Sequence, residues 1–317
     1  MKPPTLQAIV FAFTAALSDY STDQRGDVGS WIRIAALNAL ERVLPETKRD
    51  AVPQTMLEEV VRGLVKQAVE KLEPVREAAA LALAGLRWAG LTWDGVEALV
   101  FVPSEGAPFR YFDQQQWFLS AGPLLHTQYR SAVIVGLALS IGSQISPTAS
   151  LAFAALMHHL DADFSKFGDI LRDLLGLLNG NLNQNRVFIP TMITIAKLFG
   201  ETDLLRLTPS MQQTSAQIIA VASRGIAQTK SIERISAAMK LATSSILLHS
   251  DASLEALPLF LAHRFPRIRA MTSEQLYLTL STDDIEHELE EILLETSWTD
   301  KGVGAEEAAK VVTFLRR

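Results

Sequence analysis

A short pattern of apolar residues, arginine and alanine recurs along the chain at the spacing of a helical repeat. Residues 32–40 align with residues 75–83, and in both segments an arginine is followed by a pair of alanines and a closing Ala-Leu. Arg33 and Arg76 are therefore 43 residues apart, within the roughly 40–47 residues typical of HEAT and armadillo arrays. A third copy surrounds Arg269, and weaker copies contain Arg130 and Arg186.

This spacing predicts stacked helix pairs. A two-helix unit cannot cover its own apolar face, so neighbouring units must cover it, and small alanines let their helices approach closely. The arginine can then reach an acidic group of the adjacent unit. Helical periodicity is nearly continuous, so we expect an all-α, HEAT/armadillo-type α-solenoid of about fourteen helices spanning residues 1–317. The alternative is an irregular helical domain in which the repeated arginines and alanines are coincidental.

The clearest helix pair lies near the start of the chain. Asp27 is expected to cap a helix that runs to Leu44, where Pro45 ends it. The main apolar stripe of this helix is expected at Val28, Trp31, Ile32, Ala35, Ala39 and Val43, widened by a second stripe at Leu37, Leu40 and Leu44. The next helix has one apolar face, and Glu58 is expected to pair with Arg62 on the other. That apolar face consists of Met56, Val60, Leu64 and Ala68.

Composition excludes several classes of protein. Hydrophobic residues make up 48% and charged residues 20%, which is too apolar for a disordered chain. A net charge of −6 argues against a general nucleic-acid binder. The absence of cysteine excludes disulfides and thiolate chemistry. Apolar runs such as 133–141 and 151–157 are far shorter than the roughly 20 residues that cross a bilayer, and no secretory signal is expected at the N-terminus.

Sequence motifs for catalysis or metal binding are also missing. The chain contains no glycine-rich phosphate loop, no Gly-x-Ser-x-Gly elbow and no His-Glu-x-x-His. Adjacent His158 and His159 would point about 100° apart on a helix, so both cannot easily face one ion. We therefore expect no catalytic residue, no metal site and no cofactor.

One segment interrupts the helical rhythm. Residues 104–125 contain a turn cluster and five aromatic residues, namely Phe109, Tyr111, Phe112, Trp117 and Phe118. Such a segment is either an irregular junction, in which the aromatics fill the space between two sub-arrays, or a binding ridge.

Residues 19–33 resemble the segment that opens the C-terminal domain of the tubulin-specific chaperone D family, also called tubulin-folding cofactor D. The motif positions are Asp19, Tyr20, Arg25, Gly26, Asp27, Val28, Gly29, Trp31 and Arg33. Further similar stretches follow in family order at 129–142, 186–192, 265–269 and 293–300. Arg76, Arg130 and Arg269 are interpreted as structural residues of the repeat.

The resemblance implies a non-enzymatic scaffold for tubulin folding and microtubule biogenesis. Members of the family are longer and use HEAT repeats to hold β-tubulin. They work with tubulin cofactors C and E and an Arf-like small GTPase, as a GTPase activator complex, to join or separate α/β-tubulin heterodimers in the cytoplasm and at the cytoskeleton. The alternative is a HEAT-repeat adaptor for transport or trafficking. The five tryptophans follow no repeat period, which argues against that alternative.

The densest basic cluster is the candidate partner-binding site. It lies at residues 263–269, and cations from residues 224–234 are expected to share the same edge. The candidates are His263, Arg264, Arg267, Arg224, Lys230 and Arg234. In one interpretation these side chains cap helices and stabilise the array; in the other they capture acidic tubulin or another cofactor electrostatically.

Overall fold

The computed structural model describes residues 3–46, 52–90, 114–143, 146–203, 206–248, 250–280, 286–300 and 302–316. The chain forms two compact units, residues 1–165 and residues 166–317, and each is described by itself. The described residues contain helices and no strand beyond an isolated bridge between Asp23 and Gly26. None of the described helices combines the length and apolar character that a membrane crossing requires.

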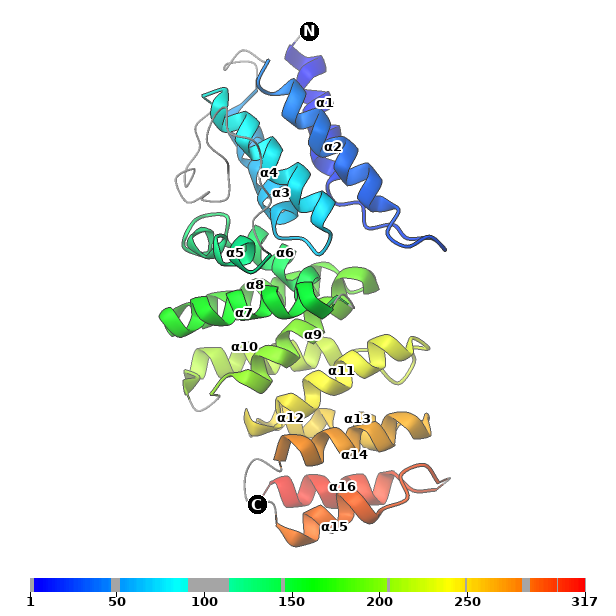
Figure 1. Cartoon of the computed structure of the whole chain (residues 1–317). Helices are drawn as coiled ribbons and strands as arrows, with labels where there is room; N and C mark the ends of the chain where they lie inside the picture. Colours follow the sequence, from blue (N-terminus) through cyan, green and yellow to red (C-terminus); the bar gives the residue numbers. More distant parts are fainter. Residues whose placement is uncertain are drawn as a thin grey trace. The chain divides into compact units, whose positions relative to one another are not determined.

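The first unit consists of antiparallel helix pairs that stack on one another (Figure 1). Helices α2 and α4 pack together, while α3 contacts both α4 and α6, and α7 covers α5 and α6. The helices are α1 (Pro3–Ala16), α2 (Gly29–Val43), α3 (Gln54–Ala68), α4 (Glu73–Trp88), α5 (Gln114–Leu119), the 3₁₀ helix η3 (Gly122–His126), α6 (Arg130–Ile141) and α7 (Ser146–Ala162).

The second unit repeats this arrangement in two layers, preceded by the 3₁₀ helix η4 (Phe164–Lys166). One layer contains α8, α10 and α12, and the other contains α9, α11 and α14 in contact side by side. The helices are α8 (Phe167–Gly180), α9 (Asn185–Glu201), α10 (Pro209–Ser223), α11 (Ile232–Ser244), η6 (Ile246–Leu248), α12 (Asp251–Ala256), α13 (Pro258–Leu261), α14 (Pro266–Leu280), α15 (His287–Glu295) and α16 (Ala305–Leu315).

Local chemistry explains where several helices begin. The hydroxyl of Thr208 accepts a hydrogen bond from the Met211 amide at the start of α10, and Ser231 and Ser250 do the same for α11 and α12. These side chains satisfy amide groups that have no partner inside the helix. Each helix start is therefore encoded within a few residues of sequence.

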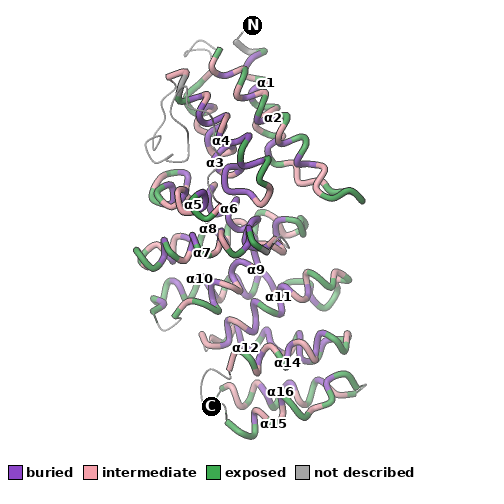
Figure 2. Tube along the Cα trace, viewed as in Figure 1, coloured by how far each residue is buried: buried purple, intermediate pink, exposed green. Residues whose placement is uncertain are grey.

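The stacking depends on small side chains, as the repeat predicts. Helix α4 packs against both α2 and α3, and its buried positions are mostly alanine (Ala78, Ala79, Ala80, Ala82 and Ala84). Buried segments form the seams between the helices of each unit, and exposed residues line the outer turns (Figure 2). The HEAT-type, all-α fold class is confirmed within each unit.

The predicted main stripe of α2 is wrong. Trp31 is 58% exposed and Ile32 is 46% exposed, whereas Leu37 and Leu40 have no exposed surface. The expected second stripe is therefore the buried one. Arg33 also has no exposed surface, and its ion pairs hold this face of α2 inward.

Two predicted polar contacts differ in detail, one at the start of α2 and one in α3. The N-cap position of α2 is Val28 and not Asp27 as predicted, although the Asp27 carboxylate accepts a hydrogen bond from the Ser30 amide in the first turn at 3.1 Å. In α3, Arg62 pairs with Glu59 at 3.6 Å instead of with Glu58, whose carboxylate accepts a hydrogen bond from Gln54. The expected apolar face of α3 is confirmed at Val60, Leu64 and Ala68.

Candidate protein-interaction surface

The repeated arginine is a buried structural residue in the three strong copies. Arg33 and Arg76 have no exposed surface, and Arg269 is 6% exposed. Each contacts the residue six positions earlier, which lies in the turn before its own helix. Arg33 Nη1 donates to Asp27 Oδ1 at 3.2 Å. Arg76 Nη1 donates to the Glu70 carbonyl at 2.7 Å, and Arg269 Nη1 to the His263 carbonyl at 2.9 Å.

Two of these arginines, Arg33 and Arg269, also join one turn to the next. Arg33 reaches Glu70 of the following helix pair, with Nη2 and Oε1 3.4 Å apart, as the stacking model expects. Arg269 donates to the carbonyls of Trp298 and Asp300. The weaker copies differ, since Arg130 is half-buried and Arg186 is exposed. At Arg33 and Arg269 the repeat arginine is thus a link between successive interhelical turns.

The family-motif segment 19–33 consists of a tightly bonded loop, residues 19–28, followed by the first residues of α2. Asp23 and Gly26 exchange two backbone hydrogen bonds, and Gly26 has a φ of 107° that favours glycine. A Cβ at Gly29 would lie 2.4 Å from the Asp19 carbonyl oxygen, so only glycine fits there. Arg25 lies over the exposed Trp31 ring, 4.9 Å from its centroid.

A mixed cluster of charged and polar groups anchors this loop to the end of α3. Asp27 contacts Arg33 and also Lys71 Nζ at 3.1 Å. The Tyr20 ring lies under the Arg33 guanidinium at 4.5 Å, and its hydroxyl accepts a hydrogen bond from Gln67. Lys66 Nζ donates to Ser18 Oγ at 3.1 Å. The sequence analysis did not identify Lys66, Gln67, Glu70 and Lys71 as members of this cluster. For Glu70 a usable signal existed, because Asp27 and Glu70 each precede an arginine of the repeat by six residues.

Burial and the charge of Arg33 oppose each other at the two carboxylates of this cluster and reinforce each other at Lys66. Burial would raise the pKa of Asp27, but the hydrogen bond and charge of Arg33, together with Lys71, hold it below its ordinary value. Burial raises the pKa of the Glu70 carboxyl although Arg33 opposes the shift. Burial, reinforced by the positive charge of Arg33, lowers the pKa of Lys66 to about 8. The cluster has the character of an internal support and not of an exposed binding site.

The predicted partner-binding residues fall into two groups in the second unit. Arg224, Lys230, Arg264 and Arg267 are exposed. His263, in contrast, is only 4% exposed, and its Nδ1 accepts a hydrogen bond from the Phe265 amide. His263 therefore supports the turn from within and does not lie on the surface, which corrects its place in the predicted set.

Arg234 is half-buried and has a structural role as well. Its Nη1 donates to the Leu182 carbonyl at 2.8 Å and to Asn185 Oδ1 at 3.2 Å. Its guanidinium lies over the Phe188 ring at 4.3 Å. Burial lowers the pKa of Arg234. Arg234 thus fastens the start of α11 to the turn before α9.

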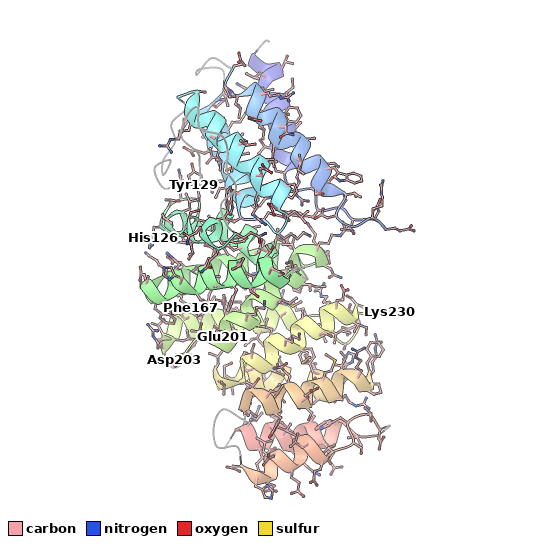
Figure 3. The ribbon with its side chains drawn as sticks, in the orientation of Figure 1. His126, Tyr129, Phe167, Glu201, Asp203 and Lys230 are labelled. Atoms are coloured by element: carbon pink, nitrogen blue, oxygen red, sulfur yellow. The ribbon has the colours of Figure 1, made fainter. Side chains whose placement is uncertain are left out.

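Contacts between turns place the exposed cations on one edge of the second unit. Arg264 Nη2 donates to the Thr229 carbonyl at 2.9 Å, which brings the turn before α14 against the turn before α11. Lys230 directly follows Thr229, at the N-terminal end of α11 (Figure 3). We define the basic edge as Arg224, Lys230, Arg264 and Arg267, the exposed cations that flank these two turns.

Cations outnumber acids along this edge of an acidic chain. The turns and first helical residues at 181–186, 224–234, 262–269 and 296–300 have seven cationic side chains, namely Arg186, Arg224, Lys230, Arg234, Arg264, Arg267 and Arg269, against the carboxylates of Glu233 and Asp300. The whole chain has a net charge of −6. Positive charge is therefore concentrated here.

Only part of the aromatic segment 104–125 lies within the described residues. Phe109, Tyr111 and Phe112 lie outside them. Trp117 and Phe118 are buried, and Trp117 Nε1 donates to the Ala68 carbonyl at 2.7 Å. These two rings fill the junction between α3, α4 and α7 and form no exposed ridge.

The described residues contain no group of three or more potential metal-ligating side chains. His159 is buried and makes an edge-to-face contact with the His126 ring, with centroids 4.7 Å apart.

Comparison with known proteins gives a match to one family. The family model "Tubulin folding cofactor D C terminal" matches residues 58–234, which is more than half of the chain. The matched region runs from α3 to the start of α11 and includes Arg224, Lys230 and Arg234. An engineered protein of known crystal structure covers 99% of this chain and 91% of its own, at 14% identity and a TM-score of 0.29, too low to define the fold.

Proposed function

We propose that this chain, which belongs to the tubulin folding cofactor D C-terminal family, is a protein-binding scaffold that acts on the α/β-tubulin heterodimer. In this proposal it holds β-tubulin together with tubulin cofactors C and E and an Arf-like small GTPase, in the cytoplasm and at the cytoskeleton. The match over residues 58–234 is the observation that carries the proposal. Stacked helix pairs suit the role because they present a long, preformed surface that needs little ordering on binding.

The chain's own contribution to this role would be binding and positioning. Its buried charged groups are used internally, as the Arg33–Glu70 and Arg269–His263 contacts illustrate. Any effect on GTP turnover would then come from the arrangement of tubulin and the small GTPase on the scaffold. The exposed turns of the second unit, with their excess of cations, are the surface best suited to acidic partners.

The test is binding of the purified chain to purified α/β-tubulin. Gel filtration with light scattering would be performed on mixtures of the chain with tubulin, first alone and then with cofactors C and E and the small GTPase. We expect co-elution in at least one mixture. No co-elution in any mixture overturns the proposal. Tight binding of a basic import-signal peptide instead would favour a HEAT-repeat transport adaptor.

A further inference from the structure

The edge of the second unit where α11 and α14 begin is built from turns that arginine side chains fasten to one another. Arg234 bonds to Leu182 and Asn185, Arg264 to Thr229, and Arg269 to His263, Trp298 and Asp300. These bonds use backbone carbonyls of four different turns. Because the backbone is held in this way, the exposed side chains on the turns are presented from a fixed frame.

The cationic side chains of the basic edge remain available for binding despite these internal hydrogen bonds. Arg224, Lys230 and Arg267 are exposed, and none of them forms an ion pair or side-chain hydrogen bond with another residue of the described chain. Arg264 donates from Nη2 to Thr229 and stacks on Phe265, yet it remains exposed. Glu233 and Asp300 are the exposed acids of the neighbouring described turns. A concentration of exposed cations with few nearby acids attracts a negatively charged partner.

The spacing of the turns favours an extended partner. Helices α9, α11 and α14 pack side by side, and packed helix axes are roughly 8–10 Å apart. An extended chain advances about 3.3 Å per residue. A peptide that crosses the edge would therefore pass from one turn to the next in about three residues, and a run of carboxylates would meet a cation at each turn.

We propose that the basic edge binds an extended acidic peptide segment of a partner protein through Arg224, Lys230, Arg264 and Arg267. This inference is based on charge complementarity. It rests on the proposed function only for the identity of the protein that supplies the acidic segment. The buried residues His263 and Arg269 position the turn but do not contact the ligand.

Fluorescence anisotropy with a labelled oligoglutamate peptide tests the proposal directly. The native chain should bind it at low salt and lose affinity as salt rises, because screening weakens contacts between exposed charges. The double variant Arg264→Glu/Arg267→Glu should bind at least roughly tenfold more weakly, and so should Lys230→Glu. The matched control is Lys240→Glu, which makes the same change at an exposed position near the other end of α11 and should bind like the native chain.

Four results would overturn the inference. The first two are no binding of oligoglutamate at low salt, and an equal loss of oligoglutamate affinity in Lys240→Glu and in the edge variants. The third is binding of an oligoglutamine peptide of the same length with equal affinity. The fourth is tighter binding of a single-stranded oligonucleotide, which would assign the edge to nucleic acid instead. Thermal unfolding of the variants, followed by circular dichroism, distinguishes a folded variant that has lost its binding site from a variant that does not fold. Tubulin binding is measured on the same proteins, so the two proposals can fail separately. Co-elution with tubulin without oligoglutamate binding rejects only the proposal for the basic edge. Absence of tubulin co-elution in every mixture rejects the proposed function.

Discussion

Arg33 and Glu70 are separated by 37 positions in the sequence and form an ion pair in which neither side chain has exposed surface. Arg33 Nη1 also donates to the Asp19 carbonyl at 2.5 Å, and the Asp27 carboxylate lies 3.2 Å from the guanidinium. Glu70 Oε2 accepts a hydrogen bond from the Leu72 amide. One arginine thus connects the family-motif loop, helix α2 and the end of helix α3.

Removal of Arg33 should destabilise the protein strongly. Arg33→Met leaves the Glu70 carboxylate buried without its partner, and breaking a buried pair in this way costs about 3–5 kcal/mol. The matched control is Arg25→Met, because the Arg25–Asp23 pair is exposed and pairs of that kind contribute about 0–1 kcal/mol. Urea unfolding monitored by circular dichroism measures both. Equal losses in the two variants would contradict a special role for the buried pair.

Lys66 should give stability a defined dependence on pH. Its folded pKa is about 8 and its ordinary value is 10.5, so between these values the unfolded chain binds more protons than the folded one. The free energy of unfolding then rises with pH in that window. Compared with Lys66→Met, the native chain should gain stability between about pH 8 and about pH 10. Urea titrations across this range check the sign, and a constant difference between the two proteins would contradict it.

Substitution by alanine should change the stability of the protein in opposite directions at two helical glycines. A Cβ at Gly136 in α6 would lie 2.3 Å from the Lys66 carbonyl oxygen and 2.6 Å from Val69 Cγ2, so Gly136→Ala should destabilise by about 1–3 kcal/mol. A Cβ at Gly176 in α8 meets nothing within 4 Å, so Gly176→Ala should stabilise by about 0.5–1 kcal/mol. Thermal and urea unfolding of both variants measure the difference. A stabilised Gly136→Ala would show that α6 and α3 are not in this close contact.

Trp117 should contribute strongly to the stability of the first unit, because it fills the junction between α3, α4 and α7. Trp117→Phe keeps an aromatic ring but leaves the buried Ala68 carbonyl without the indole donor, at a cost of about 1–3 kcal/mol. Trp117→Ala also leaves a cavity and should cost about 3–5 kcal/mol. Unfolding followed by circular dichroism gives both values. If Trp117→Phe were neutral, the indole hydrogen bond would contribute nothing, and the ring would act only by filling space.

Periodicity and short-range chemistry accounted for the existence of most helices and for the start of several. The 43-residue interval located two arginines that prove equivalent in three dimensions, since Arg33 and Arg76 both bond to the residue six positions earlier. The basic cluster at 263–269 was visible as a sequence run, but the burial of His263 was not. A run of charges does not reveal which of its members turns inward.

The sequence alone determined that this chain is helical, that its helices repeat with alanine-rich seams, and that it resembles a family of tubulin chaperones. Helix propensity, capping and periodicity act over a few residues, so they can be read from the chain directly. Only the tertiary structure decided that Leu37 and Leu40, and not Trp31 and Ile32, face the core, and that His263 is buried while its neighbour Arg264 stays exposed. Those outcomes depend on contacts between residues far apart in sequence, whose geometry arises only when the helices pack.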